Sequence, residues 1–116
     1  MKTLTADEIV QAKGYPEETI DIPEWGGSVT VRSLSMGARS DIAEKAFTGE
    51  GDKRKVDNFK FAILSVKHGL IVPKLTDEQA DKLADKGPEV IERLLAAIWK
   101  LSNLSPESAK NELPQE

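Results

Sequence analysis

The sequence predicts an α+β domain, mostly helical, in which one antiparallel β-hairpin packs on a bundle of four or five helices. Two patterns carry this prediction. Apolar and polar residues alternate on both sides of a Pro-Glu-Trp-Gly-Gly segment, which is typical of a hairpin with one apolar face. In two longer segments the apolar residues recur every three or four positions, which indicates amphipathic helices. We expect one globular domain over residues 1–104 and a polar, flexible tail over 105–116.

The hairpin is expected at about residues 18–33. Isoleucines alternate with polar residues up to Pro23, which cannot donate to a strand ladder and so ends the first strand. Gly26 and Gly27 come next, and both can adopt the positive φ values of a tight return. A two-stranded hairpin is only marginally stable by itself. The apolar face must therefore pack on helices, or the hairpin must gain a third strand.

Capping signals and apolar periodicity place the helices. Thr5 with Glu8, and Thr76 with Gln79, have the spacing of a capping box at a helix start. The expected helices span about residues 5–13, 36–47, 55–68, 76–85 and 88–102. The third of these is apolar around most of its circumference, so we expect it to be central and buried. It should pack against the last helix, whose apolar face is broad.

The connections between helices give three smaller expectations. Residues 48–55 hold two glycines among charges, which is typical of a flexible loop. Residues 70–73 form a short extended piece that a proline ends. On the outside of the last helix, Glu89 and Arg93 have the i, i+4 spacing of an ion pair.

Composition excludes several classes of protein. The chain has 116 residues and a mass of 12.7 kDa, which is the size of one domain. Its 16 basic and 20 acidic residues give a net charge of −4, so we expect no nucleic-acid partner. The absence of cysteine excludes disulfides, thiol catalysis and Cys-ligated zinc, and favours an intracellular location. No apolar run approaches the roughly 20 residues of a membrane span, so we expect no membrane partner.

The sequence offers little catalytic chemistry. His68 is the only histidine, and a catalytic role would need a nucleophile and an orienting carboxylate beside it. Its position near a helix end, where the helix dipole is negative, explains it without catalysis. No motif of a phosphate-binding or calcium-binding loop is present. We therefore expect no catalytic residue, no metal site and no cofactor.

One of the two tryptophans is the strongest candidate for contact with a partner. Trp25 lies at a turn, where a large apolar ring is unusual. Either its ring folds back into the core, or it is an exposed anchor, since tryptophan is enriched at binding hot spots. Trp99 lies beside the apolar stripe of the last helix, at the core or at its boundary.

The order of these segments resembles the tail assembly chaperones of long-tailed bacteriophages. The most telling pieces are the Trp25-Gly26-Gly27 hairpin and the ending Leu101-Ser102-Asn103-Leu104, and the resemblance covers about residues 18–111. It implies a non-enzymatic factor that keeps the tape measure protein soluble and helps recruit tail tube subunits. Such a factor acts in the cytoplasm of an infected or lysogenic bacterium and is absent from the mature virion. The residues expected to bind the partner are Trp25, Gly26, Gly27, Arg32, Arg39 and Trp99.

The broad apolar faces of the helices at 55–68 and 88–102 exceed what one hairpin can cover, so we expect apolar surface to remain for a partner or for self-association. The resemblance also implies a longer second product, made by ribosomal slippage near the end of the gene. Ala109-Lys110-Asn111 can be encoded as GCA-AAA-AAC, which contains a slippery run near the chain end. Two other classes of protein stay open. One is a structural tail or head-completion protein of the virion, and the other is a small regulatory adaptor of a host cell.

Overall fold

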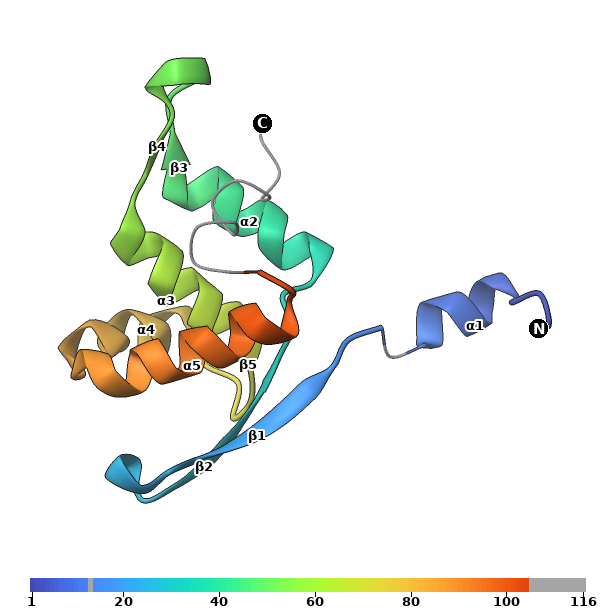
Figure 1. Ribbon diagram of the computed structural model, residues 1–116, viewed down its shortest axis with the longest axis horizontal. Helices are drawn as coiled ribbons and strands as arrows, with labels where there is room; N and C mark the ends of the chain where they lie inside the picture. The colour runs from blue at the N-terminus through green and yellow to red at the C-terminus, as the bar shows by residue number, and fades with distance from the viewer. Residues whose placement is uncertain (13, 105–116) are drawn as a thin grey trace.

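The computed structural model describes residues 1–12 and 14–104, and it confirms a mostly helical α+β fold (Figure 1). The helices are α1 (Ala6–Gln11), α2 (Met36–Ala46), α3 (Asn58–Gly69), α4 (Asp77–Asp81) and α5 (Pro88–Leu101). The strands are β1 (Glu17–Ile22), β2 (Gly27–Arg32), β3 (Phe47–Thr48), β4 (Lys55–Val56) and β5 (Leu70–Val72). Three short 3-10 helices are η1 (Pro23–Trp25), η2 (Gly51–Lys53) and η3 (Lys82–Asp85). The tail expected over 105–116, with its slippage segment, lies outside the described residues.

The predicted hairpin is present, and it gains a third strand. β1 and β2 pair antiparallel from Glu17 opposite Arg32 to Ile22 opposite Gly27. The extended piece after α3 is β5, which pairs with the other edge of β2, so the strand order is β1-β2-β5. The apolar face of this sheet also packs on α5, where Ile22 and Val31 are fully buried. Both ways of stabilising the hairpin are therefore used.

Only one of the two glycines in the turn between β1 and β2 has a positive φ. Pro23–Trp25 form the short helix η1, and Gly26 ends it with a φ of 79° in the left-handed region. Gly27 is the first residue of β2 and pairs with Ile22. The expectation of positive φ at both glycines is thus wrong for Gly27, because the ladder begins one residue earlier.

Helix α3 lies at the centre of the molecule, as predicted, and contacts α2, α4 and α5. Phe61 and Val66 are buried in these contacts. The helix begins at Asn58, three residues later than expected, because Asp57 caps it through a hydrogen bond to the Lys60 amide. Phe59 departs from the expectation of burial around most of the helix, since this residue is 58% exposed.

The segment expected to be a flexible loop is a small β-ribbon. Phe47 and Thr48 of β3 pair with Val56 and Lys55 of β4, and η2 forms the tip. The Phe47 ring explains the ordering: it lies 5.9 Å from the ring of Phe61 and carries the Arg54 guanidinium 4.5 Å from its centroid. The sequence did not predict this ribbon, because the local pattern of glycines and charges gives no sign of the contact between Phe47 and Phe61.

Both predicted capping boxes form, but only one of the two helices packs on the body. Beyond the cap Thr76, α4 runs to Asp81 and the chain continues as η3 to Asp85. Leu83 of η3 is buried in the core. After Thr5, α1 ends at Gln11 and buries no residue. Figure 1 shows α1 projecting away from the remaining elements. None of the described helices is long and apolar enough to cross a membrane.

Candidate partner-binding surface

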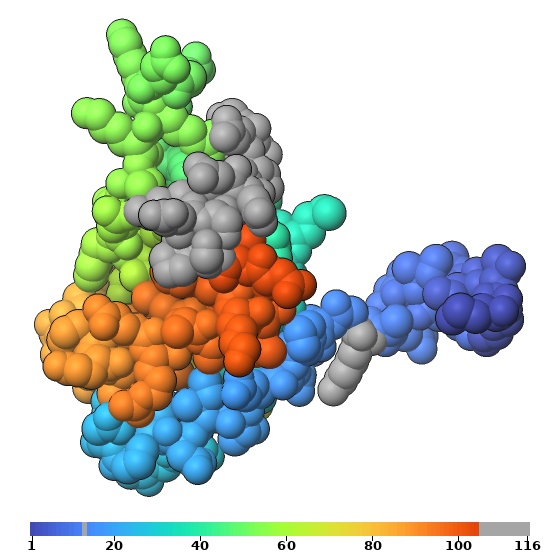
Figure 2. All heavy atoms as spheres, in the orientation of Figure 1, coloured from blue at the N-terminus to red at the C-terminus, as the bar shows by residue number. Residues whose placement is uncertain are grey.

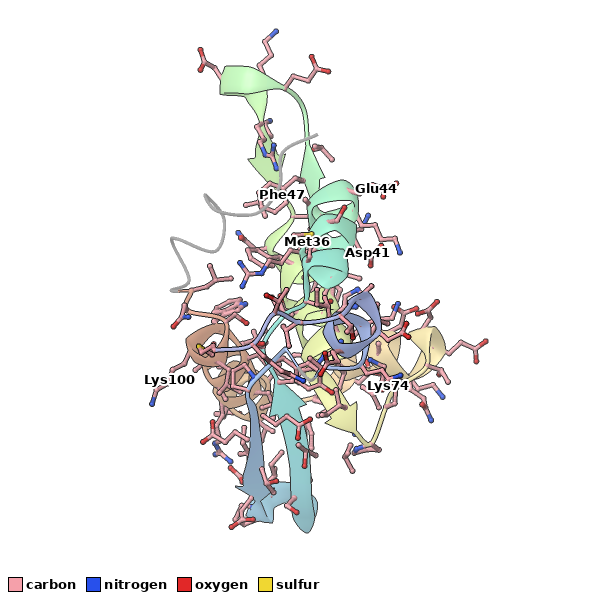
Figure 3. All side chains as sticks on the ribbon, turned by 90° about the vertical axis from the view of Figure 1, so that its right-hand side faces the viewer. Met36, Asp41, Glu44, Phe47, Lys74 and Lys100 are labelled. Atoms are coloured by element: carbon pink, nitrogen blue, oxygen red, sulfur yellow. The ribbon has the colours of Figure 1, made fainter. Side chains whose placement is uncertain are left out.

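A hollow of about 560 Å³ runs along the outer side of α5. We call it the α5 groove, and its lining residues are Glu92, Leu95, Ala96, Trp99, Lys100 and Leu104. Its floor is apolar, and one acidic and one basic residue stand on its rim. Figure 2 shows α5, in orange and red, across the middle of the visible face, and Figure 3 shows Lys100 pointing away from the body.

The amphipathic character of α5 creates this surface. One face of the helix is buried against α3 and the sheet, and it carries Val90, Ile91, Leu94, Leu95 and Ile98. On the outer side Ala96 is exposed, and its small side chain leaves space between its neighbours. Trp99 lies at the boundary: its ring packs 5.6 Å from the ring of Phe61 and also lines the groove. Its indole Nε1 is buried without a hydrogen-bond partner among the described residues.

The Leu101-Ser102-Asn103-Leu104 ending closes the groove. Asn103 adopts a left-handed conformation with a φ of 58°, which asparagine tolerates better than most residues. The Asn103 amide donates to the Lys100 carbonyl over 3.1 Å, and the Leu104 amide donates to the Trp99 carbonyl over 2.7 Å. These two bonds define a Schellman motif, which folds the chain back over the last turn of a helix. Leu104 is thereby buried beside Trp99 at one end of the groove.

Arg39 and Ser102 hold the same end of α5 against α2. The Arg39 guanidinium donates to the Ser102 carbonyl over 3.0 Å and to the Leu34 carbonyl over 3.4 Å. The Ser102 hydroxyl accepts from the Leu34 amide over 2.8 Å and donates to the Ile98 carbonyl over 2.6 Å. Arg39 therefore supports the groove from behind, and it does not line it.

The hairpin tip is tied to the other half of α5. The Glu24 carboxylate accepts two hydrogen bonds from the Arg93 guanidinium, over 3.0 and 2.6 Å. This pairing lowers the pKa of Glu24 to about 2. The i, i+4 pair expected between Glu89 and Arg93 is thus wrong, because the hairpin brings Glu24 within reach of the guanidinium.

Trp25 is beside this ion pair, and its side chain is 42% exposed. Its ring is therefore outside the buried core, which favours the anchor alternative. Trp99 lies six residues beyond Arg93, about 9 Å further along the axis of α5 at the usual rise per residue. Trp25 thus lies near the first half of α5, and Trp99 lies in its last turn.

The other sequence-predicted residues lie elsewhere. Gly26 and Gly27 shape the hairpin tip, and Arg32 is half-buried on β2 with its guanidinium 4.5 Å from the centroid of the Tyr15 ring. Sequence reasoning missed Glu92, Ala96, Lys100 and Leu104. An alanine on the outer face of an amphipathic helix, before the Asn-Leu ending, was the signal that could have found them.

His68 takes part in a contact between helices. Its Nε2 lies 2.7 Å from the Asp41 carboxylate, which also pairs with Lys45 over 2.9 Å. Burial raises the pKa of Asp41, but the hydrogen bonds from His68 and Lys45 together outweigh it, so the net shift is downward. No group of three or more potential metal ligands occurs within residues 1–12 and 14–104.

These features define a small α+β module with an apolar groove along its last helix. The fold is similar to that of the tail assembly chaperone of bacteriophage HK97, with a TM-score of 0.50 and 19% sequence identity. The match covers 82% of this chain and 94% of that chain. No protein-family model and no curated protein matches the sequence. The shared fold supports the resemblance that the sequence motifs indicated.

Proposed function

We propose that this chain is a non-enzymatic tail assembly chaperone of a long-tailed bacteriophage. The observation that carries the proposal is the fold it shares with the HK97 tail assembly chaperone. The two sequence motifs add support, because the Trp-Gly-Gly turn forms the tip of the hairpin and the Asn-Leu ending caps the end of α5. The chain acts in the cytoplasm of the infected or lysogenic bacterium and is absent from the mature virion.

The partner is the tape measure protein, held through the α5 groove. An amphipathic helix binds a groove by burying apolar residues at i, i+3, i+4 and i+7. Leu95, Ala96 and Trp99 offer such a helix an apolar floor. Covering the apolar stripe of a long helical protein removes the surface through which it would aggregate, so binding alone keeps it soluble.

The rim charges set the kind of helix that fits. Glu92 and Lys100 are eight residues apart on α5, about 12 Å along its axis. A partner helix with a basic residue near Glu92 and an acidic residue near Lys100 would be favoured over one with the reverse order. Such exposed pairs affect orientation and association rate more than affinity.

The hairpin tip supplies a second contact with the tape measure protein. Trp25 presents an exposed ring on a turn that Gly26 and the Glu24–Arg93 pair hold in place. A rigid aromatic side chain is a common anchor at protein interfaces. The tail tube protein is the second partner, and a longer slippage product of the same gene is a third.

Co-expression tests the proposal. The tape measure protein alone should aggregate, and co-expression with this chain should give a soluble complex that elutes as one species. Ala96→Arg should abolish the complex, because it places a long charged side chain on the apolar floor at an exposed position. Ala84→Arg makes the same change at an exposed alanine of η3 outside the groove and should leave the complex intact.

The alternatives give different results. If the solubility of the tape measure protein is unchanged and this chain is found in purified particles, it is a structural tail or head-completion protein. If its gene lies far from tail tube and tape measure genes and no complex forms, a host adaptor becomes the better explanation.

A further inference from the structure

The α5 groove lies where the described part of the chain ends. Leu104 is one of its lining residues, and the Leu104 amide donates to the Trp99 carbonyl over 2.7 Å. Residues 105–116 follow Leu104 directly, and we call them the C-terminal segment. This segment is therefore attached at one end of an apolar groove.

The sequence of the C-terminal segment carries the signals of one short helix over about residues 106–113. Ser105 is of a type that caps helices, and Pro106 then takes the first helical position, where proline is favoured. Pro114 ends the pattern, because a helix usually stops before a proline. Pro106, Ala109 and Leu113 have the i, i+3, i+7 spacing of an apolar stripe. The segment is thus suited to form an amphipathic helix with one narrow apolar face.

Such a helix has the length of the groove. Eight residues at the usual helical rise span about 12 Å, which is also the distance between Glu92 and Lys100 along α5. The reversal at Asn103 turns the chain back over the last turn of α5. A helix that runs back from Leu104, antiparallel to α5, therefore covers the floor of the groove from one end to the other.

We propose that the C-terminal segment docks in the α5 groove of its own chain and leaves it when a partner helix binds. Its apolar stripe covers the floor around Ala96. The groove rim and the segment both carry charges of both signs, so apolar burial carries the contact. A segment tethered beside its site has an effective concentration of the order of millimolar, so a weak contact is enough to keep the groove covered.

An unpaired donor beside the groove gives a second reason to place the segment there. The Trp99 indole Nε1 is buried and has no acceptor among residues 1–12 and 14–104. Buried polar groups in folded proteins nearly always have a hydrogen-bond partner. The C-terminal segment begins directly after Leu104, whose amide already bonds to Trp99, so a carbonyl or carboxylate of the segment is within reach of this donor.

Docking of the segment does not depend on the proposed function, but its displacement by the tape measure protein does. The segment and the partner compete for one groove. The segment covers the apolar floor while no partner is present, which limits the exposed apolar surface through which proteins aggregate. A longer partner helix buries more apolar surface than the stripe of the segment does, and so displaces it.

The absence of cysteine from the chain allows a direct test. Ala96→Cys places a single thiol on the floor of the groove, and its rate of alkylation by N-ethylmaleimide measures how often the floor is open. Leu113→Asp removes the largest apolar side chain of the stripe, so it should raise this rate by about threefold or more. The rate should not depend on protein concentration, because the covering segment belongs to the same chain.

Two matched controls separate docking from general effects. Ala84→Cys places the thiol on an exposed residue of η3 outside the groove, and Leu113→Asp should leave its alkylation rate unchanged. Asn111→Asp adds the same charge to the side of the segment that is opposite the stripe. It should leave the rate at Ala96→Cys unchanged.

Competition for the tape measure protein tests the displacement. When wild-type and Leu113→Asp chains are co-expressed with the tape measure protein, the variant should be enriched in the complex. The enrichment should equal the rise in alkylation rate, because both report the fraction of open grooves. A rise in alkylation rate without enrichment would leave the segment in the groove and overturn binding of the tape measure protein there.

Two results would overturn the docking itself. One is an alkylation rate at Ala96→Cys that Leu113→Asp leaves unchanged. The other is a rate that falls as the protein concentration rises, which would show that a second copy covers the groove in place of the segment of the same chain.

Discussion

Glu24 and Trp25 are neighbours at the hairpin tip, and their side chains have different surroundings. Glu24 reaches Arg93 on α5 and ties the tip to the helix. Trp25 keeps 42% of its surface exposed beside this tie. An aromatic residue on a turn that its own chain covers only in part is suited to contact another protein.

Trp25→Ala should weaken binding of the tape measure protein while changing the unfolding free energy little. Loss of a hot-spot side chain typically costs about 2 kcal/mol or more of binding free energy. Titration calorimetry of the complex and chemical denaturation of the free chain measure the two effects, and Trp25→Phe is the control that keeps an aromatic ring. A loss of about 3–5 kcal/mol in unfolding free energy would instead mark Trp25 as a core residue.

The Glu24–Arg93 pair makes part of the stability depend on pH. The pairing lowers the pKa of Glu24 from 4.5 to about 2. The contribution of this pair to the unfolding free energy is therefore complete above about pH 4.5. It is lost as the pH falls toward 2, where Glu24 becomes protonated in the folded chain as well. Both side chains are more than 40% exposed, so the solvent screens the pair and the effect on stability is small.

Denaturation of the wild type and of Glu24→Gln over this pH range measures the contribution. The wild type should be the more stable protein above pH 4.5, and the difference should shrink to nothing near pH 2. Glu89→Gln is the matched control, because it removes a carboxylate from α5, the helix of Arg93, and leaves the Glu24–Arg93 pair intact. A difference between wild type and Glu24→Gln that stays constant with pH would contradict the assignment.

At the scale of elements, the close contact of α3 with α5 depends on a glycine. A Cβ atom on Gly69 would lie 2.5 Å from Cδ1 and 2.9 Å from Cγ2 of Ile98. Ile98 is fully buried, so its side chain has no free space to move into. The two long helices meet closely because no side chain stands between them.

Gly69→Ala should lower the unfolding free energy by about 1–3 kcal/mol, the usual cost of overpacking a core. Ile98→Val removes the nearest methyl group, so Gly69→Ala should cost less in that background, and a double-mutant cycle measures the coupling. Gly37→Ala is the control, because a Cβ atom there would lie 4.0 Å from the Ser35 hydroxyl inside the first turn of α2. At that position alanine should raise stability by up to about 1 kcal/mol. Equal effects at both glycines would contradict the packing argument.

The elements that the sequence predicted are those with local causes. The capping boxes at Thr5 and Thr76 and the alternation around the Trp-Gly-Gly turn depend on residues a few positions apart. The elements that it missed depend on distant partners. The ribbon of β3 and β4 needs the Phe61 ring, and the Arg93 ion pair needs the hairpin tip.

In the candidate surface, too, the sequence predicted features with a local cause and missed those that depend on the fold. Trp99 was expected at the core or at its boundary. Trp25 was visible in the sequence because a large apolar ring is unusual at a turn. The α5 groove was not, because it is made of space beside Ala96 and of the fold-back at Asn103. Arg39 shows the opposite case: it belongs to a motif of the resemblance, and the structure gives it a role in holding α5.

At the scale of the whole molecule, the proposed surfaces lie on different parts of one body. The hairpin sheet and α3 support α5, whose outer side carries the α5 groove. The hairpin tip with Trp25 lies outside this groove and is tied to α5 by the Glu24–Arg93 pair.

Binding of the tape measure protein should survive moderate salt. If affinity comes from apolar burial in the α5 groove, raising the salt concentration should change it little, because screening acts on exposed charges. Pull-down of the tape measure protein over a salt series measures this, with Lys100→Glu as the variant for the rim and Ala96→Arg for the floor. Lys100→Glu should mainly slow association, whereas Ala96→Arg should abolish binding at every salt concentration. A complex that dissociates as salt rises, and that Lys100→Glu disrupts as strongly as Ala96→Arg, would instead place the recognition in the charges of the rim.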